Sequence, residues 1–258
     1  MADLLAAVAG VTAAAGRIAL ARWRTDFRRW EKAPGNPVCE VDLAVDAMLR
    51  RDLFALLPDA GWLSEETVDA PDRLARRRLW VVDPIDGTRD YIRGRPGWAI
   101  SVALVEDGCP LLGVLDAPAR GEAWGAVAGE GAWRNGVRLR ASGRTALAGA
   151  RVPIETLPRA DADLVAVDKP NSIALRIAKV AADEADLVTT LRWGHEWDIA
   201  AAALIAAESG ARMTDAFGRP LMFNKVDPRA FGMVAAAPGI HAAAVDRLAS
   251  RAAAAVAG

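Results

Sequence analysis

LWVVDPIDGT, the stretch at residues 79–88, joins an apolar run to two closely spaced carboxylates. The apolar run is typical of a buried strand, which would deliver Asp83 at its carboxyl end. Pro84 forces a turn, and Asp86 follows on the same turn. The two carboxylates and the intervening main-chain carbonyl of Ile85 can therefore converge on one point. Such hard oxygen ligands suit Mg²⁺ or Mn²⁺ rather than zinc.

The end of this stretch is suited to hold an anion. Gly87 lets the backbone approach an oxyanion closely. If a helix begins there, free N–H groups at Gly87 and Thr88 would hold a phosphate. Two turn aspartates on their own can also cap the turn through their side chains. The metal-site interpretation therefore depends on carboxylates from elsewhere in the chain.

Two further acidic positions supply such carboxylates. Glu65 and Glu66 follow a short apolar run, although adjacent glutamates are commonly a solvated surface. Asp198 opens an Ala-rich segment expected to be helical over 198–209. The helix dipole gives Asp198 a structural reason to stand in the first turn. Each position taken alone has an ordinary explanation, so the evidence lies in their combination.

Helix and strand signals on either side predict two halves of one compact unit. The first half, residues 1–140, is expected to carry most metal ligands and an antiparallel sheet. Its expected helices are 1–24 and 42–57, and its expected strands are 78–82, 98–105, 110–116 and 122–127. The second half, residues 141–258, is expected to supply Asp198 and the substrate contacts. There the expected strands are 164–167 and 186–190, and the expected helices are 172–182, 198–209 and 242–258. This alternation indicates a parallel or mixed sheet flanked by helices, and residues 30–37 are expected to form a turn-rich surface loop.

Composition narrows the class of protein and its partners. The 258 residues are 53% apolar and 25% charged, as in globular proteins. With 32 Lys and Arg against 33 Asp and Glu, the chain lacks the basic field of nucleic-acid binders. Two cysteines are too few for a disulfide framework, which fits a reducing cytosol. In the apolar start, Asp3 and Arg17 argue against a signal peptide or membrane span. We therefore expect a cytoplasmic protein with no nucleic-acid or membrane partner.

The acidic positions occur in a recognisable order. The DPIDGT run at residues 83–88 follows Glu65-Glu66 and precedes Trp197-Asp198, and matching residues extend from Lys32 to Asp215. This pattern resembles the inositol monophosphatase family. The resemblance implies a layered α/β fold, the αβαβα sandwich, and Mg²⁺-dependent hydrolysis of a small-molecule phosphate monoester. It also implies that the protein is a homodimer.

The resemblance further implies a role for each acidic residue. The ligands of a first metal would be Glu65, Asp83 and the Ile85 carbonyl. Those of a second would be Asp83, Asp86 and Asp198, with Asp42 near a third, weaker position. The attacking water would be oriented by Glu65 and Thr88, and the phosphate would be held by Asp86, Gly87 and Thr88. Two or three Mg²⁺ ions are thus implied, with Mn²⁺ as a substitute and Li⁺ as an inhibitor. In this family the loop matching residues 31–36 is mobile, so Lys32 is expected to become ordered when Mg²⁺ binds.

The substrate is where the chain departs from the resemblance. Inositol-specific members bind a sugar hydroxyl with a glutamate in the stretch that matches residues 186–198. That glutamate is absent here, and Arg192 and Trp193 lie in its neighbourhood. Arg176 sits where the bisphosphate nucleotidase branch carries a lysine. An arginine and a tryptophan can contact a second phosphate and a base. The candidate substrate contacts are Ser172, Arg176, Arg192 and His195.

Each of these residues also has a structural interpretation. Arg176 can be a surface charge of its helix, Trp193 a core residue, and His195 a structural histidine. His241 is expected at the surface. The alternatives therefore stay open at this stage.

Several functions remain in competition. The leading one is 3'(2'),5'-bisphosphate nucleotidase, acting on 3'-phosphoadenosine 5'-phosphate. The alternative is inositol-1-monophosphatase, and less favoured are histidinol-phosphate and sugar-bisphosphate phosphatases. Phosphatases with an aspartate nucleophile place their two aspartates closer together than Asp83 and Asp86. A non-enzymatic metal- or phosphate-binding regulatory scaffold is disfavoured because the full ligand set is present.

Overall fold

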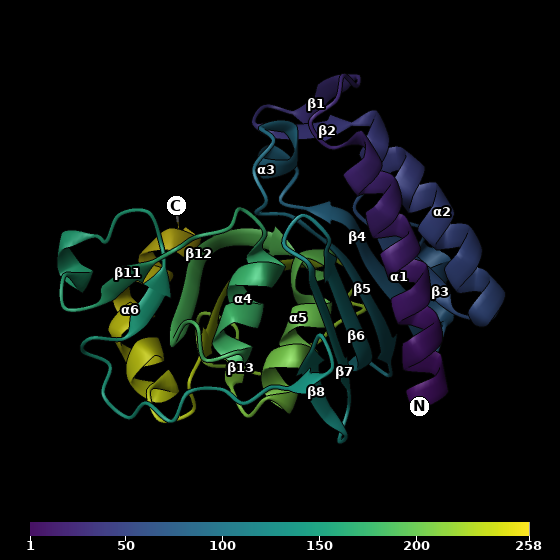
Figure 1. Cartoon of the computed structure of the whole chain (residues 1–258). Helices are drawn as coiled ribbons and strands as arrows, with labels where there is room; N and C mark the ends of the chain where they lie inside the picture. Colours follow the sequence, from purple (N-terminus) through teal and green to yellow (C-terminus); the bar gives the residue numbers. More distant parts are fainter. Residues whose placement is uncertain (258) are drawn as a thin grey trace.

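A seven-stranded sheet carries the DPIDGT stretch (Figure 1). The computed structural model describes residues 1–257, and the strand order is β3-β4-β5-β6-β7-β8-β9. β3 and β4 are parallel, and every later neighbour pair is antiparallel. The strands are β3 (Gly61–Ser64), β4 (Arg78–Asp86), β5 (Ala99–Glu106), β6 (Cys109–Ala117), β7 (Glu122–Val127), β8 (Gly131–Arg134) and β9 (Val137–Arg138). The antiparallel strands expected in the first half are confirmed.

Helices cover both faces of this sheet. The helices α1 (Ala2–Arg22) and α2 (Glu40–Leu56) lie on one face, and α4 (Ile173–Ala181) and α5 (Glu196–Glu208) lie on the other. β4 shows why its sequence is apolar without alternation: Trp80 packs with α1 and α2, whereas Val81 packs with α4 and α5. A strand buried on both faces has no polar side to present.

A second, three-stranded sheet lies beyond α4 and α5. Its strands are β12 (Leu187–His195), β14 (Arg229–Ala236) and β13 (Arg212–Thr214), in that order. One face packs on α4 and α5, and α6 (His241–Ala257) covers the other (Figure 1). The layers therefore run helix, sheet, helix, sheet, helix. This confirms the expected αβαβα sandwich.

Alanine and glycine allow the central helix to sit very close to the large sheet. Residues 200–203 of α5 are alanines, and all of them are buried. A β-carbon placed on Gly113 of β6 would lie 2.7 Å from the carbonyl oxygen of Ala201. Only glycine fits there, because a methyl group would overlap the helix backbone.

Two sequence-based expectations differ from the structure. Residues 30–37, expected to be a loop, form most of a hairpin of β1 (Arg29–Ala33) and β2 (Asn36–Cys39), which turns at Gly35. The parallel or mixed sheet expected in the second half is wrong, because the sheet of β12, β14 and β13 is purely antiparallel. The parallel pairing there is β10 (Arg151–Pro153) with β11 (Val165–Val167), so β11 and β12 belong to different sheets. Short connecting helices are α3 (Thr88–Ile92), η1 (Pro71–Ala75) and η2 (Arg159–Asp161).

The first helix meets the length and hydropathy requirements of a membrane span. The helix α1 has a mean hydropathy of 1.8 over its most apolar window, so Arg17 does not end the apolar stretch as expected from the sequence. In the structure, Val8, Ala15 and Ala19 are fully buried in the cluster that also contains α2 and β4. This face of α1 is part of the core.

Candidate active site

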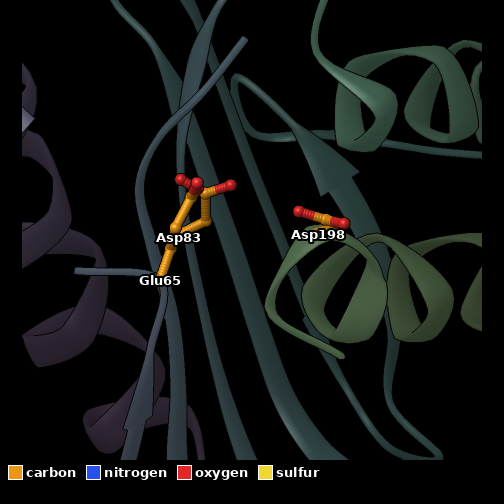
Figure 2. Close-up of side chains that lie close together, drawn as sticks. All are labelled: Glu65, Asp83 and Asp198. Atoms are coloured by element: carbon orange, nitrogen blue, oxygen red, sulfur yellow. The ribbon is translucent and has the colours of Figure 1, made fainter. Parts of the chain in front are cut away.

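Three carboxylates from distant parts of the chain meet at one end of the large sheet. Glu65 follows β3, Asp83 lies within β4, and Asp198 stands in the first turn of α5. One oxygen from each lies within 4.8 Å of the others. Figure 2 shows Glu65 and Asp83 side by side, with Asp198 facing them from the start of α5. We call these residues the acid cluster.

The parallel pairing of β3 and β4 brings the first two together. Because Ser64 pairs with Val82, the next residues along the two strands, Glu65 and Asp83, lie beside each other. The register of β4 against β5 shifts between Asp83 and Asp86, which frees the backbone around Ile85. Asp83 fixes this turn by accepting the N–H of Ile85 at 3.0 Å. Asp198 accepts the N–H of His195 at 2.8 Å, as a residue of the first helical turn does.

Asp86 has partners at the start of α4. Its carboxylate accepts the Ser172 hydroxyl at 2.5 Å and the N–H of Ala174 at 2.7 Å. Asp86 lines the same cavity as the acid cluster but lies outside the closest group of three. It therefore joins β4 to α4 and leaves part of its carboxylate toward the cavity.

Asp42 and Thr88 lie together beside the acid cluster. Asp42, in the first turn of α2, is 1% exposed and accepts the N–H of Cys39 at 2.9 Å. The Thr88 hydroxyl lies 3.2 Å from an Asp42 oxygen and 2.9 Å from the Ile85 carbonyl oxygen. Thr88 also begins α3, directly after Gly87, whose φ of 93° is left-handed. Thr88 lines the cavity, and Asp42 lies behind it.

Lys32 is the cation nearest to the glutamate pair. Its Nζ lies 2.9 Å from Glu65 Oε1 and 2.8 Å from Glu66 Oε1. The hairpin of β1 and β2 carries this lysine, and Arg89 of α3 donates to the carbonyl of Gly35 at its turn. The hairpin thus closes one side of a cavity of about 490 Å³.

Burial and mutual repulsion raise the pKa values of the site carboxyls. Burial and the charges of Asp86 and Glu65 raise the pKa of Asp198 to about 8. Burial, with Glu65, Asp86 and Asp198 as neighbours, raises the pKa of Asp83 well above its usual range. Burial also raises the pKa values of Asp42 and Asp86 to about 6 each. Carboxylates crowded in this way are stabilised by cations between them, and an all-oxygen ligand set fits Mg²⁺.

This electrostatic arrangement predicts how stability depends on pH without metal. The folded protein keeps the Asp198 proton up to about pH 8, whereas the unfolded chain releases it near 3.8. The unfolded state therefore binds fewer protons in this window, so stability falls as the pH rises through it. In EDTA, differential scanning fluorimetry should show a melting temperature that decreases from about pH 6 to about pH 8. Mg²⁺ should reduce this decrease, and a flat or rising curve in EDTA would contradict the prediction.

The candidate substrate contacts have different surroundings. Arg176 is 8% exposed, lines the cavity, and donates to the carbonyl of Asn171 at 2.7 Å. Arg192 and Trp193 are exposed on the cavity wall, so Trp193 is not a core residue. Ser172 is fully buried and bonded to Asp86, which leaves it no surface for a substrate. That expectation is corrected: Ser172 supports Asp86 instead.

The two histidines also have defined partners. His195 lines the cavity, and its ring stacks on Trp197 with centroids 4.3 Å apart. His241 is 2% exposed and lies 3.0 Å from the Thr214 hydroxyl, so its expected surface position is wrong. It is buried because it begins α6, which packs on the second sheet.

Sequence reasoning missed the surroundings of Trp193. The Arg229 guanidinium lies 5.1 Å from the Trp193 ring centroid, and the Phe231 ring meets it edge-on at 5.4 Å. Both come from β14, which pairs with β12. No spacing or motif indicated β14, so the sequence held no signal for this contact.

Comparison with known proteins agrees with this fold. The profile of the inositol monophosphatase family matches residues 1–256. A 3'(2'),5'-bisphosphate nucleotidase, CysQ of Escherichia coli K12, is 34% identical over 208 residues, covering 75% of this chain and 82% of that protein. A fructose-1,6-bisphosphatase/inositol-1-monophosphatase of Thermotoga maritima is 34% identical over 214 residues, covering 79% and 81%. The solved structure of a Thermotoga maritima IMPase has a TM-score of 0.84 and 28% identity, covering 99% of this chain and all of that one.

The fold and these relatives define the class of protein as a phosphatase, a phosphoric monoester hydrolase. More particularly, the chain belongs to the inositol monophosphatase family.

Proposed function

We propose that this chain hydrolyses a small-molecule phosphate monoester with Mg²⁺ bound at the acid cluster. The observation that supports this most is the approach of Glu65, Asp83 and Asp198 to within 4.8 Å in a cavity. The Ile85 carbonyl and Asp86 would complete the ligands, with Asp42 near a weaker position. Bound divalent ions activate a water molecule, clamp the phosphate and neutralise the leaving oxygen.

The chain's own residues would orient the reactants. Glu65 and Thr88 would hold the attacking water in line with the scissile bond, since both line the cavity. The N–H groups of Gly87 and Thr88, at the start of α3, would hold phosphate oxygens. Lys32 would keep the hairpin of β1 and β2 over the site through its ion pairs with Glu65 and Glu66.

Within this function we propose 3'-phosphoadenosine 5'-phosphate as the leading substrate. Arg176 and Arg192 line the cavity and would bind its second phosphate, and the exposed Trp193 would contact its base. The similarity to the nucleotidase CysQ supports this choice. The second candidate, inositol 1-phosphate, is supported by the similarity to the inositol-1-monophosphatase of Thermotoga maritima.

The test compares phosphate release from these two substrates at equal concentration, with Mg²⁺ and with EDTA. We expect release from both to require Mg²⁺ and the nucleotide to be preferred. Arg192→Gln should raise KM for the nucleotide about tenfold, because a charge-assisted hydrogen bond is lost, and should leave inositol 1-phosphate hydrolysis unchanged. Arg50→Gln, an exposed change on α2, is the matched control.

The outcomes separate substrate from mechanism. A preference for inositol phosphate would overturn the nucleotide assignment and leave the metal chemistry in place. Hydrolysis in EDTA would contradict the metal-dependent mechanism itself.

The hairpin of β1 and β2 gives a second test of metal binding. Lys32 pairs with Glu65 and Glu66, so the hairpin contacts the proposed metal site, and the family resemblance implies that residues 31–36 become ordered when Mg²⁺ binds. We expect Mg²⁺ to slow proteolytic cleavage within residues 31–36 several-fold, measured by mass spectrometry of timed digests. Equal cleavage rates with Mg²⁺ and EDTA would contradict this.

We also propose that the protein is a cytoplasmic homodimer. The family resemblance supports the dimer, and the two free cysteines, Cys39 and Cys109, fit a reducing compartment. Light scattering of the purified protein should give twice the mass of one chain.

A further inference from the structure

The acid cluster is assembled from two separate parts of the fold. Glu65 and Asp83 belong to the large sheet, whereas Asp198 belongs to α5 (Figure 2). The distance between these two parts depends on the contacts that join the segment after β3 to the start of α5. Glu196, in the same helical turn as Asp198, makes such contacts.

Glu196 fastens a distant loop to the start of α5. Its side chain is 1% exposed and accepts the N–H groups of Asn224 at 2.6 Å and Lys225 at 3.1 Å. Its own N–H donates to the carbonyl of Pro228 at 2.9 Å. Asn224 has a left-handed φ of 61°, which turns the two successive N–H groups toward the one carboxylate.

Arg73 holds the same loop from the opposite side. It lies in η1, in the segment that follows Glu65 and Glu66, and is 1% exposed. Its guanidinium donates to the Asn224 side-chain oxygen at 2.7 Å and to the Lys225 carbonyl at 2.9 Å. The Asp69 carboxylate accepts two more hydrogen bonds from the Arg73 guanidinium, at 2.6 and 2.8 Å. This bidentate pair fixes the plane of the guanidinium.

These contacts form a continuous link across the site, from the segment after Glu65 to the turn that carries Asp198. We propose that Arg73, Asn224, Lys225 and Glu196, the Arg73–Glu196 bridge, are positioning residues that set the separation of Glu65 and Asp198 and thereby the affinity for divalent cations. The proposal rests on the proposed function, because it assigns the cation to the acid cluster.

The chemistry of the bridge supports a positioning role over one in stability alone. Buried charged groups are often replaceable by apolar residues without loss of stability, so they are weak evidence for stabilisation. The Arg73 guanidinium is held in its plane by hydrogen bonds, and the Glu196 carboxylate is held by two N–H groups. Such contacts define the distance and angle between the segments that they join. Residues that hydrogen-bond directly to metal ligands commonly change metal affinity roughly 10–100-fold when altered. The bridge acts one step further from the metal, through the position of the ligands, so about tenfold is expected.

The test is calorimetric titration of the full chain with MgCl₂. Glu196→Gln should raise the Kd about tenfold, because an amide cannot accept both N–H groups as the carboxylate does. Asn224→Gly removes the side-chain oxygen that accepts from the Arg73 guanidinium and the side-chain N–H that donates to the Arg73 carbonyl at 3.4 Å, and glycine adopts the left-handed φ readily. It should fold normally and raise the Kd by a smaller factor in the same direction.

A matched control removes a comparable ion pair elsewhere. Asp161 is 8% exposed and pairs with Arg251 at 2.7 and 3.0 Å, against α6. Asp161→Asn should lower the melting temperature without changing the Kd. If Glu196→Gln and Asn224→Gly lower the melting temperature as Asp161→Asn does and leave the Kd unchanged, the inference is overturned and the proposed function stands. Failure of the unmodified chain to bind Mg²⁺ would overturn both.

Discussion

Asp198→Asn is expected to abolish phosphate release while leaving the metal-free protein at least as stable as the unmodified chain. Asparagine keeps the oxygen that accepts the N–H of His195, so the first turn of α5 stays capped. It removes one negative charge from the acid cluster, and with it the proposed contact to the second metal. A loss of about 10³-fold in kcat, equivalent to about 4 kcal/mol of transition-state stabilisation, is expected.

The stability of this variant shows whether Asp198 is a metal ligand or a residue that stabilises the fold. Burial and neighbouring charges raise the pKa of Asp198 to about 8, so its ionised form opposes folding when no metal is present. Melting temperatures in EDTA at about pH 8 should therefore be equal to or above those of the unmodified chain. In saturating Mg²⁺ the unmodified chain should instead have the higher melting temperature. Retained turnover would mean that Asp198 is not needed for catalysis, and a lower melting temperature in EDTA would mean that Asp198 is structural.

Gly87→Ala is expected to reduce both stability and activity severely. At the left-handed φ of Gly87, a β-carbon would lie 2.7 Å from the Gly97 carbonyl oxygen and 2.8 Å from the Ser172 nitrogen. These two atoms are hydrogen-bonded to each other at 2.8 Å, so the added methyl group would push apart a contact that supports Asp86. Combining backbone strain with overpacking, we expect a loss of about 3 kcal/mol in the free energy of unfolding.

Gly121→Ala is the matched control for this variant. Gly121 also has a positive φ, of 66°, but a β-carbon there would meet no atom within 4 Å. Urea unfolding should show a loss of only about 1 kcal/mol for Gly121→Ala, with kcat unchanged. Similar losses for the two variants would mean that the φ angle alone, and not the close approach to Ser172, makes Gly87 necessary.

The parts of the fold that the sequence predicts are those set by local pattern. The helix expected over 42–57 is α2, because its apolar stripe repeats at helical spacing. The strands that became β4 to β7 were predicted because turn residues separate their apolar runs. The strand expected over 186–190 is the start of β12, but its pairing was not predicted, since β14 pairs with β12 across a long stretch of chain that includes α5. Pairing at such a distance leaves no local pattern to read.

The candidate site likewise has parts that the sequence predicts and parts that depend on tertiary contacts. The meeting of Glu65, Asp83 and Asp198 agrees with the placement implied by the family resemblance, and the roles assigned to them remain predictions. The residues around them depend on tertiary contacts: Ser172 behind Asp86, Arg229 against Trp193, and Arg73 beside Asn224. A sequence shows which groups are available, but only the packing of separate elements shows which of them face one another.

The alanines of α5 have a consequence for evolution of the active site. The helix acts as a spacer of minimal width between two sheets, because Ala201 lies against Gly113 with no room for another carbon. Asp198 is carried on the same helix, so side-chain volume in the middle of the molecule, together with the Arg73–Glu196 bridge, affects how far that carboxylate stands from Glu65 and Asp83. Substitutions in α5 that do not contact substrate can thus change the geometry of the metal ligands by changing the spacing between the two sheets. Substitutions in the buried part of α5 should therefore reduce catalytic activity before they reduce folding stability.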